Sequence, residues 1–218
     1  LGASYQLATS QNTRMTAVAN SFNNDIVQTL NNAIINPSAS YSRKTQWGLI
    51  SYFGRINYAY NNKYLLAASL RRDGSSRFGQ NNKWGYFPSV SAAWRISKEN
   101  FLVDNTVINE LKLRASYGET GNFNIGDFKY LGIVSNQVFS PDNKTVNGIA
   151  QTSIANSDLS WEKVKSYDIG VDLGLFNNRL NFNIDYYNKR TQGMLYQVNV
   201  PAITGFTDAI QNIGTVEN

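Results

Sequence analysis

Alternation of apolar and polar side chains at every second position is the feature that most restricts the fold of this chain. Residues 49–96 contain three runs of about ten residues with this pattern. In the first run, Ile50, Tyr52 and Ile56 share one parity and Ser51 and Arg55 the other. A period of two predicts β-strands, because successive side chains leave a pleated strand on opposite faces. We therefore predict three consecutive antiparallel strands.

The connections between these runs differ in length. Asn61-Asn62 predicts a tight hairpin turn, because Asn tolerates the positive φ of such turns. The next connection, residues 73–83, is long, polar and rich in Gly and Ser. Short turns at one end and long loops at the other are typical of outer-membrane barrels. Aromatic residues occur near both strand ends, as expected for rings at two membrane interfaces: Tyr60, Tyr64, Trp84, Tyr86 and Phe87.

The same alternation returns later in the chain. Residues 111–117, 167–175 and 180–187 alternate, and Asn177-Asn178 predicts a second short turn, which gives six strands in all. If both Asn-Asn turns lie on one side, strand counting places residues 97–109 there and the loops 73–83 and 118–160 opposite. The loop 118–160 is too long for a simple turn, so it is either a functional loop or contains a small hairpin of its own.

Residues 1–45 are less regular. Residues 1–7 suit the end of a preceding strand, and residues 9–24 are predicted to form an exposed polar loop. A short surface helix is expected next, from Ile26, Leu30, Ala33 and Ile34, with Asn23 or Asn24 as N-cap and Pro37 beyond its end. The alternative is a helix that binds a partner.

Composition excludes several classes of protein. The chain has 218 residues without Cys or His, so disulfides and thiolate metal sites are excluded, and the commonest general base is missing. We predict neither an enzyme nor a cofactor. The net charge of +5 is spread along the chain, which argues against nucleic-acid binding.

No run of 18 apolar residues is present, which excludes a transmembrane helix and leaves a membrane barrel open. The sequence begins at Leu1 and shows no signal peptide, and we expect that processing or truncation has removed it.

The fold class predicted from the pattern is all-β, an antiparallel up-and-down meander that forms part of a transmembrane barrel. A soluble β-sandwich, such as an adhesin-like binding module, fits the period equally well. Strand lengths near the ~9 to 11 residues that cross a bilayer, together with the loop asymmetry, favour the barrel. The positions predicted to face lipid are Ile56, Leu66, Val90, Val171 and Ile184. The polar positions predicted to face the lumen are Arg55, Arg71, Arg95, Lys112, Arg114, Asp168, Asp172 and Asp185.

The two long loops are the candidates for contact with a ligand or a lid, because loops on a rigid scaffold carry recognition. The residues concerned combine rings with hydrogen-bond donors: Arg77, Phe78, Trp84, Asn122, Phe123 and Tyr130. The alternative is that the rings anchor the loops or belong to the interfacial belt.

Long segments of the chain also resemble one family. The string SYFGRINYAYNNKYLLAASLRRDGSSRFGQNNKWGYFPSVSAAWRISKENF at 51–101 is similar to the barrel of the SusC/RagA family of TonB-dependent outer-membrane transporters of Bacteroidetes-type bacteria. So are LKLRASYGETGNFNIGDFKYL at 111–131, NSDLSWEKVKSYDIGVDLGLFNNRLNFNIDYYNKRTQGML at 156–195 and TGFTDAIQNIGTVEN at 204–218.

The resemblance implies a location, partners and a larger protein. Residues 1–218 would be an interior part of one barrel domain, with a loop region at 1–45 and successive hairpins at 46–218. The TonB box and plug that precede the barrel in this family are not among these residues. The whole protein would import glycan or peptide fragments across the outer membrane, in contact with its lipid. A SusD-like lipoprotein would serve as lid, and TonB would supply energy. The lumenal Arg and Asp residues would pair with each other or with plug carboxylates.

Overall fold

The computed structural model describes residues 1–22, 26, 29–140 and 146–218. Its main feature is an antiparallel sheet with the strand order β1-β2-β3-β4-β5-β8-β9-β12. These strands are β1 (Gly2–Arg14), β2 (Tyr41–Tyr60), β3 (Tyr64–Ser75), β4 (Trp84–Arg95), β5 (Ile108–Asn122), β8 (Glu162–Leu175), β9 (Leu180–Gln192) and β12 (Thr215–Glu217). The all-β meander predicted from the alternation is confirmed.

Smaller elements complete the described part of the chain. Two hairpins form separate two-stranded sheets, β6 (Val134–Phe139) with β7 (Val146–Gln151) and β10 (Leu195–Asn199) with β11 (Asp208–Asn212). The helical elements are single 3-10 turns: η1 (Leu30–Asn32), η2 (Pro37–Ala39), η3 (Ile96–Lys98) and η5 (Ala202–Thr204). Within the described residues, none of the helices has the length and hydropathy needed to cross a membrane.

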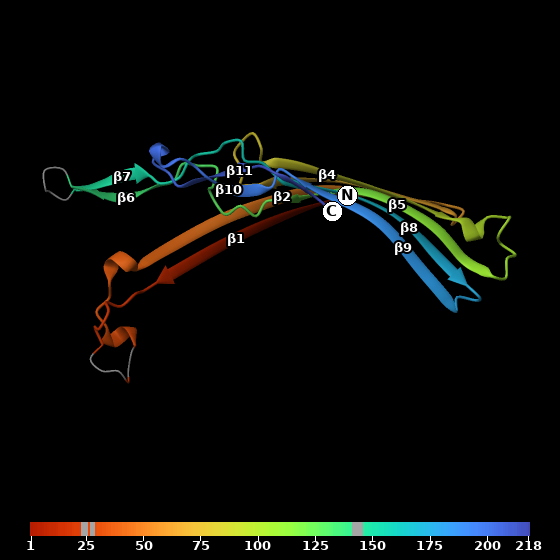
Figure 1. Ribbon diagram of the computed structural model, residues 1–218, viewed down its shortest axis with the longest axis horizontal. Helices are drawn as coiled ribbons and strands as arrows, with labels where there is room; N and C mark the ends of the chain where they lie inside the picture. Colours follow the sequence, from red (N-terminus) through yellow and green to blue (C-terminus); the bar gives the residue numbers. More distant parts are fainter. Residues whose placement is uncertain (23–25, 27–28, 141–145) are drawn as a thin grey trace. The chain divides into compact units, whose positions relative to one another are not determined.

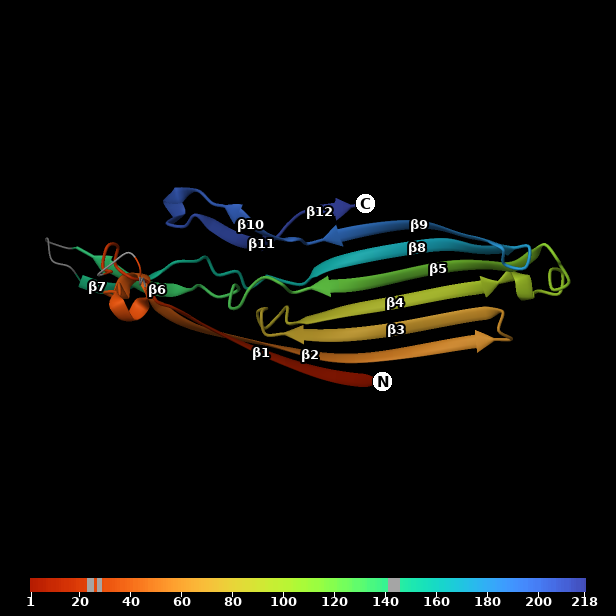
Figure 2. The same cartoon turned by 90° about the horizontal axis from the view of Figure 1, so that it is seen from below.

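The chain divides into two compact units, which are described separately. The first comprises residues 1–5 and 49–218, and the second comprises residues 6–48. In the first unit the turn between β2 and β3, the connection between β4 and β5, and the turn between β8 and β9 lie at one end of the sheet (Figure 2). The β3–β4 loop and the insertion between β5 and β8 lie at the other end, as strand counting predicted.

Asparagine residues make the short turns. Asn61 and Asn62 have φ of 47° and 55°, and Asn177 and Asn178 have φ of 58° and 60°. These left-handed conformations suit Asn, whose side chain reduces the cost of positive φ. Both predicted turns are confirmed, although the second also includes Phe176 at φ 53°.

The connection between β4 and β5, together with the strand ends beside it, is fastened to both short turns. The backbone N–H of Arg95 donates to the carbonyl of Lys63, and that of Phe176 donates to the carbonyl of Val107. Asn109 and Asn177 exchange two hydrogen bonds through a side-chain amide and a backbone N–H. These bonds join the three connections into one rim.

The long insertion between β5 and β8 contains the β6–β7 hairpin, as the second of the two sequence alternatives stated. It is shorter than predicted, because β5 continues to Asn122 and pairs there with Glu162 of β8. Asn122 is therefore the last residue of β5, the strand labelled in Figure 1.

The second unit corrects two predictions. The polar loop predicted over residues 9–24 is wrong for residues 9–14, which belong to β1 and lie beside β2. These residues are exposed on both faces, so their side chains carry no alternation to signal the strand. The backbone ladder alone makes them a strand.

The predicted surface helix is also wrong within the described residues. Leu30–Asn32 forms a single 3-10 turn, and Ala33 is already extended at φ −116° and ψ 152°. Leu30 and Ile34 are 46% and 68% exposed, so the apolar stripe has no surface to bury against, and short helices are marginal without one. The N-cap positions predicted at Asn23 and Asn24 lie outside the described residues. Asn36 instead caps η2 through its side-chain oxygen.

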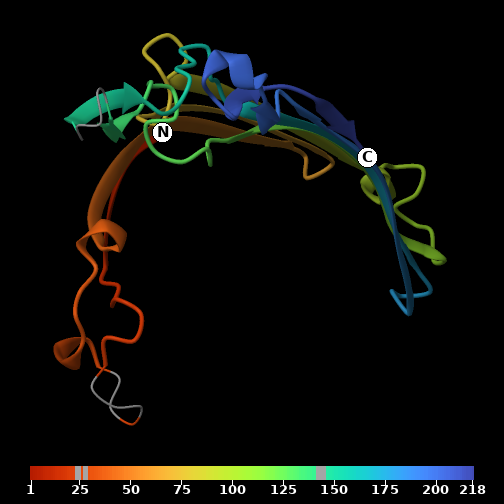
Figure 3. The ribbon, with the colours of Figure 1, turned by 60° about the vertical axis from the view of Figure 1, so that its left-hand side comes forward.

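The sandwich alternative is excluded by the exposure of the apolar parity. Ile56 is 74% exposed and Ile184 is 68% exposed, and Leu66 and Val90 are about half exposed. In a sandwich these side chains would be buried between two sheets. Within the first unit the sheet is instead a single curved layer (Figure 3).

Candidate functional site

The strand register gives the sheet one apolar and one polar face. The ladder aligns Ile56, Ala68, Val90, Tyr117 and Tyr167 on one face. Side-chain alternation along each strand extends this assignment to the other positions. All five positions predicted to face lipid lie on that apolar face, and all eight polar positions predicted to face the lumen lie on the opposite, polar face.

Aromatic rings mark both ends of the apolar face in β2, β3 and β4. Near the short turn, the ring centroid of Tyr64 lies 6.3 Å from those of both Tyr60 and Trp94. We call these three residues the turn-side band. Near the long loop, Tyr52 and Trp84 stack with centroids 6.2 Å apart. With Tyr86, which lies on the same face, they form the loop-side band.

A carboxylate holds the turn-side band in place. Glu99, which follows η3, accepts hydrogen bonds from Lys63 Nζ at 3.0 Å, Tyr64 Oη at 2.8 Å and Trp94 Nε1 at 3.0 Å. The bonds from Lys63, Tyr64 and Trp94 lower the pKa of the Glu99 carboxyl from the usual 4.5 to about 2. A charged acceptor thus orients two rings of the band.

An ion-pair network occupies the polar face between β5, β8 and β9. The Arg114 guanidinium lies 2.8 Å from Asp172 and 2.8 Å from Asp185, and 3.9 Å from Asp168. Lys112 Nζ adds a contact of 3.3 Å to Asp172. The network contains two cations and three carboxylates, so most of its charges are compensated by neighbouring side chains of the same sheet.

A glycine makes room for this network. A Cβ atom at Gly170 would collide with Asp185 and Arg114. The Arg114 side chain can therefore cross β8 to reach Asp185 only because position 170 has no side chain.

A second charged group lies closer to the loops. Arg71 Nε contacts Asp73 at 2.7 Å, and its Nη2 donates to Ser51 Oγ at 2.9 Å. Asp73 and Ser51 are buried, at 7% and 1% exposed. The remaining predicted lumenal arginines have neutral partners, since Arg55 donates to Asn57 and Arg95 to Asn62.

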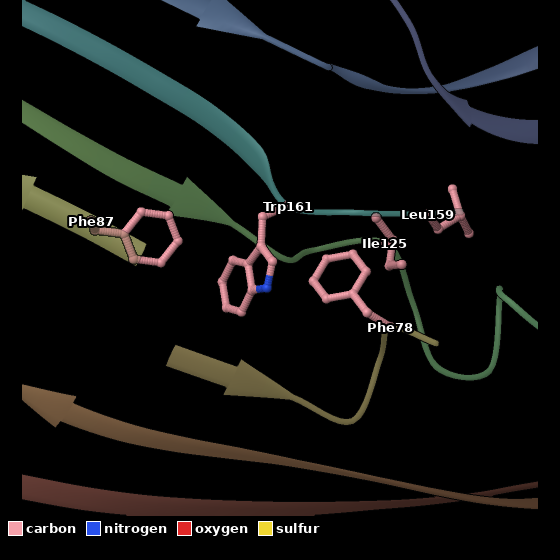
Figure 4. Close-up of a cluster of buried hydrophobic side chains, with 5 residues drawn as sticks. All are labelled: Phe78, Phe87, Ile125, Leu159 and Trp161. Atoms are coloured by element: carbon pink, nitrogen blue, oxygen red, sulfur yellow. The ribbon is translucent and has the colours of Figure 1, made fainter. Parts of the chain in front are cut away.

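A cluster of buried apolar side chains lies at the loop end of the sheet. It consists of Phe78, Phe87, Ile125, Leu159 and Trp161 (Figure 4). The Trp161 ring centroid lies 5.2 Å from Phe78, 5.3 Å from Phe87 and 5.5 Å from Phe123. The Trp161 Nε1 donates to the Lys83 carbonyl at 3.1 Å. The cluster therefore joins the β3–β4 loop to both ends of the β5–β8 insertion.

Two glycines form the floor of this cluster. A Cβ atom at Gly85 or Gly121 would collide with the Phe87 ring and come within about 3 Å of Trp161. Both rings can therefore lie directly on the backbone of β4 and β5.

An ion pair closes the loops beside the cluster. Arg77 Nε lies 2.9 Å from Asp127 Oδ1, and its Nη1 donates to Asn124 Oδ1 at 3.4 Å. The guanidinium also lies over the Phe123 ring at 5.4 Å. Both side chains of the Arg77–Asp127 pair are largely buried, at 13% and 10% exposed.

The structure brings most of the predicted loop contacts together. Phe78 has no exposed surface, and Phe123 and Tyr130 pack against the cluster. Asn122 caps the following turn by accepting from the N–H of Asn124. Trp84 lies apart from them on the apolar face. Contact of these residues with a ligand or lid stays a prediction.

Comparison with known proteins identifies the family. A family model described as "TonB dependent receptor-like, beta-barrel" matches residues 1–218. The chain belongs to this family. The resemblance to TonB-dependent transporters is thereby confirmed, as is the barrel fold class.

Individual relatives of this TonB-dependent receptor barrel agree with the match. TonB-dependent receptor P39 of Formosa agariphila is 46% identical over 198 residues, which cover 90% of this chain and 19% of that protein. TonB-dependent receptor SusC of Bacteroides thetaiotaomicron is 43% identical over 175 residues, covering 78% and 17%. The RagAB peptide importer in its closed-closed state superposes with a TM-score of 0.82 at 30% identity, covering 99% of this chain and 24% of that one. The chain thus spans about a fifth of the length of its curated relatives.

Three residues of this TonB-dependent receptor barrel were missed by sequence reasoning. Arg72 has the parity of Leu66 and Leu70, so alternation alone would have placed a cation on the apolar face. Glu99 and Trp161 lie in segments without a period, and only the fold brings them to their partners.

Proposed function

We propose that the chain forms part of the wall of a TonB-dependent transporter barrel in a bacterial outer membrane. The observation that carries this proposal is the exposed apolar face bounded by the turn-side and loop-side bands. In β2 these bands are represented by Tyr60 and Tyr52, eight positions apart. At ~3.4 Å per residue this is about 27 Å along the strand, or about 22 Å along the membrane normal for a strand tilted by about 35°, which is close to the ~25 Å apolar belt of outer-membrane barrels.

The polar face would line the lumen. Its charges are mostly paired within the sheet, as the Arg114 network shows. Paired charges suit a confined, partly hydrated interior, because an unpaired ion there would be costly. Asp168 has the longest contact of the network, at 3.9 Å, and is the carboxylate best placed to receive a cation from a plug.

The relatives support a proposal for substrate and partners. One relative is named SusC, and a solved structure is described as a peptide importer. The whole protein would accordingly import glycan or peptide fragments, with a SusD-like lipoprotein as lid and TonB as energy source. The open edges of the sheet, β1 and β12, would pair with further strands of a closed barrel.

The test uses the complete protein that carries these residues, in its own host. Its gene is deleted, and uptake of labelled oligopeptides and labelled oligosaccharides is measured with and without a protonophore. We expect the deletion to abolish energy-dependent uptake of one of the two classes, and the wild-type gene to restore it. Unchanged uptake of both classes, or recovery of the protein in the soluble fraction, would overturn the proposal.

A further inference from the structure

Arg72 is a cation on the apolar face of the sheet, beside the loop-side band. Arg72 pairs with Tyr52 of β2 and Tyr86 of β4 in the register, so it shares the face of the residues proposed to contact lipid. Its neighbour Arg71 is on the polar face and is paired with Asp73. Arg72 is thus separated by the sheet from the nearest carboxylate in its own strand.

Aromatic rings hold the Arg72 side chain. The centre of its guanidinium lies 4.1 Å from the Trp84 ring centroid and 5.5 Å from that of Tyr86. Its Nε atom is buried and has no hydrogen-bond partner. Among the residues that the structure describes, Arg72 takes part in no ion pair. Stacking fixes the position of this cation and leaves its charge without a protein anion.

An apolar groove runs from Arg72 toward the middle of the strands. It has a volume of about 880 Å³ and is open to the outside. Ala68 keeps it hollow, because it is small beside Ile56 and Leu70. The side chain of Leu1 covers Gly54 at one side of the groove. Strands β2, β3 and β4 line it with Tyr52, Ile56, Ala68, Leu70, Arg72 and Tyr86, and Leu1 and Gly2 line it as well.

We propose that this groove binds an anionic, phosphate-bearing lipid, with the phosphate on Arg72 and an acyl chain along the groove. The proposal rests on the function proposed above, since it requires this face to contact the membrane. Charge complementarity selects the occupant. A cation on a lipid-facing surface is costly unless it is paired, and the phosphates of the headgroup layer are the anions available at the end of the strand. The planar guanidinium also matches phosphate geometry, and the rings hold it oriented beforehand.

The experiment measures lipid binding by the complete protein in detergent micelles. The probes are lipid A with its phosphates and the same lipid with the phosphates removed, each titrated and followed by native mass spectrometry. For Arg72→Gln we expect about tenfold weaker binding of phosphorylated lipid A, the loss of one charge-assisted contact. Binding of the dephosphorylated lipid should not change. Arg72→Lys should restore part of the affinity, because it keeps the charge without the planar fork.

A matched variant controls for the charge change. Arg95→Gln removes the same charge from the polar face at the turn end of β4 and should bind both lipids like the wild type. Millimolar inorganic phosphate should not displace the lipid, and displacement would indicate a free-phosphate site instead. Equal binding of phosphorylated lipid A by wild type and Arg72→Gln would overturn the inference.

A measurement of folding distinguishes a failure of this inference from a failure of the proposed function. Circular dichroism of each variant in micelles shows whether the barrel is formed. A wild-type protein that does not enter micelles as a β-structure would speak against the proposed function. A folded barrel whose lipid binding is independent of Arg72 would refute the lipid site alone.

Discussion

At the scale of single residues, the face on which a side chain leaves its strand decides what it contacts. Arg71 and Arg72 are neighbours in β3, yet Arg71 binds Asp73 and Arg72 lies over Trp84. One guanidinium is neutralised by a carboxylate and the other is held by ring faces. The same contrast separates Ile184 from Asp185 in β9, since the first is 68% exposed on the apolar face and the second belongs to the Arg114 network.

An arginine at Ile184 tests the lipid-facing assignment. Ile184 pairs with Val171, which lies between Tyr167 and Leu175 near the middle of β8. We expect Ile184→Arg and Val171→Arg each to lower the free energy of unfolding of the complete protein in lipid by about 2 to 4 kcal/mol, the cost of a cation at mid-membrane depth. Urea unfolding in bilayers measures this change.

The control is Tyr187→Arg, on the polar face of the same strand. It should change the free energy of unfolding by less than about 1 kcal/mol, as is usual for exposed positions. Equal costs at Ile184 and Tyr187 would contradict the assignment of the two faces.

The carboxyl of Glu99 predicts a pH dependence of stability. Its pKa is about 2 in the folded protein against the usual 4.5, so its contribution is fully present above about pH 4.5 and is lost as the pH falls toward 2. Glu99→Gln should therefore abolish the part of the acid destabilisation that falls in this window. Thermal unfolding of wild type and variant between pH 2 and pH 6 measures the difference.

Asp104→Asn is the matched control for this experiment, because Asp104 is an exposed carboxylate of the same connection between β4 and β5. It should leave the pH profile of the wild type unchanged. Identical profiles for Glu99→Gln and the wild type would rule out the proposed role of the three hydrogen bonds.

At the scale of elements, the loops are anchored more firmly than their polar composition suggests. The β3–β4 loop is closed by a backbone hydrogen bond of 3.0 Å from Ser75 to the Lys83 carbonyl, and Trp161 Nε1 donates to the same carbonyl. Phe78 inserts its ring beside Trp161 from within that loop. The loop is thus fixed by packing at its tip and by hydrogen bonds at its base.

Removal of Trp161 should release this loop. Trp161 is 5% exposed, and truncation of such a ring costs about 3 to 5 kcal/mol. We expect Trp161→Ala to speed hydrogen exchange at the Ser75 amide and to expose the β3–β4 loop to proteases while the strands stay protected. Trp94→Ala, which removes a tryptophan from the turn-side band, should leave the Ser75 amide as slow as in the wild type.

Strands with one apolar and one polar face could be predicted from the sequence. Strand segments exposed on both faces and the packing of the loops could not. The hairpin of β8 and β9 is evident because Val171 and Ile184 alternate with Asp172 and Asp185. The residues of β1 beyond Leu7 carry no such pattern, because polar side chains are exposed on both faces there. The loop cluster escaped prediction for a different reason. Phe78 and Trp161 are far apart in the sequence, and only the neighbouring positions of β3, β4, β5 and β8 bring them together.

At the scale of the whole molecule, the two faces of the sheet would give the proposed barrel wall a defined orientation between lipid and lumen. The chain matches about a fifth of the length of its relatives, so most of the proposed barrel lies in other residues. The polar face of this part already balances most of its charge through Arg114 and Arg71. Lumenal chemistry in the complete protein would then depend on the few groups left with long contacts, such as Asp168.

The register also sets how the strands would cross a membrane. The row of ladder partners through Tyr60, at the end of the first hairpin, runs through Tyr64, Trp94 and Leu113 to Val171. The hairpin of β8 and β9 ends four residues further on, at Leu175, after four steps between strands. One residue of stagger per strand, at ~3.4 Å along and ~4.8 Å across, slants the strands by about 35° if both turns lie at one depth. That slope corresponds to the tilt of the strands against the axis of a closed barrel. These strands alone would therefore already set the angle at which all the strands of the complete barrel run around the pore.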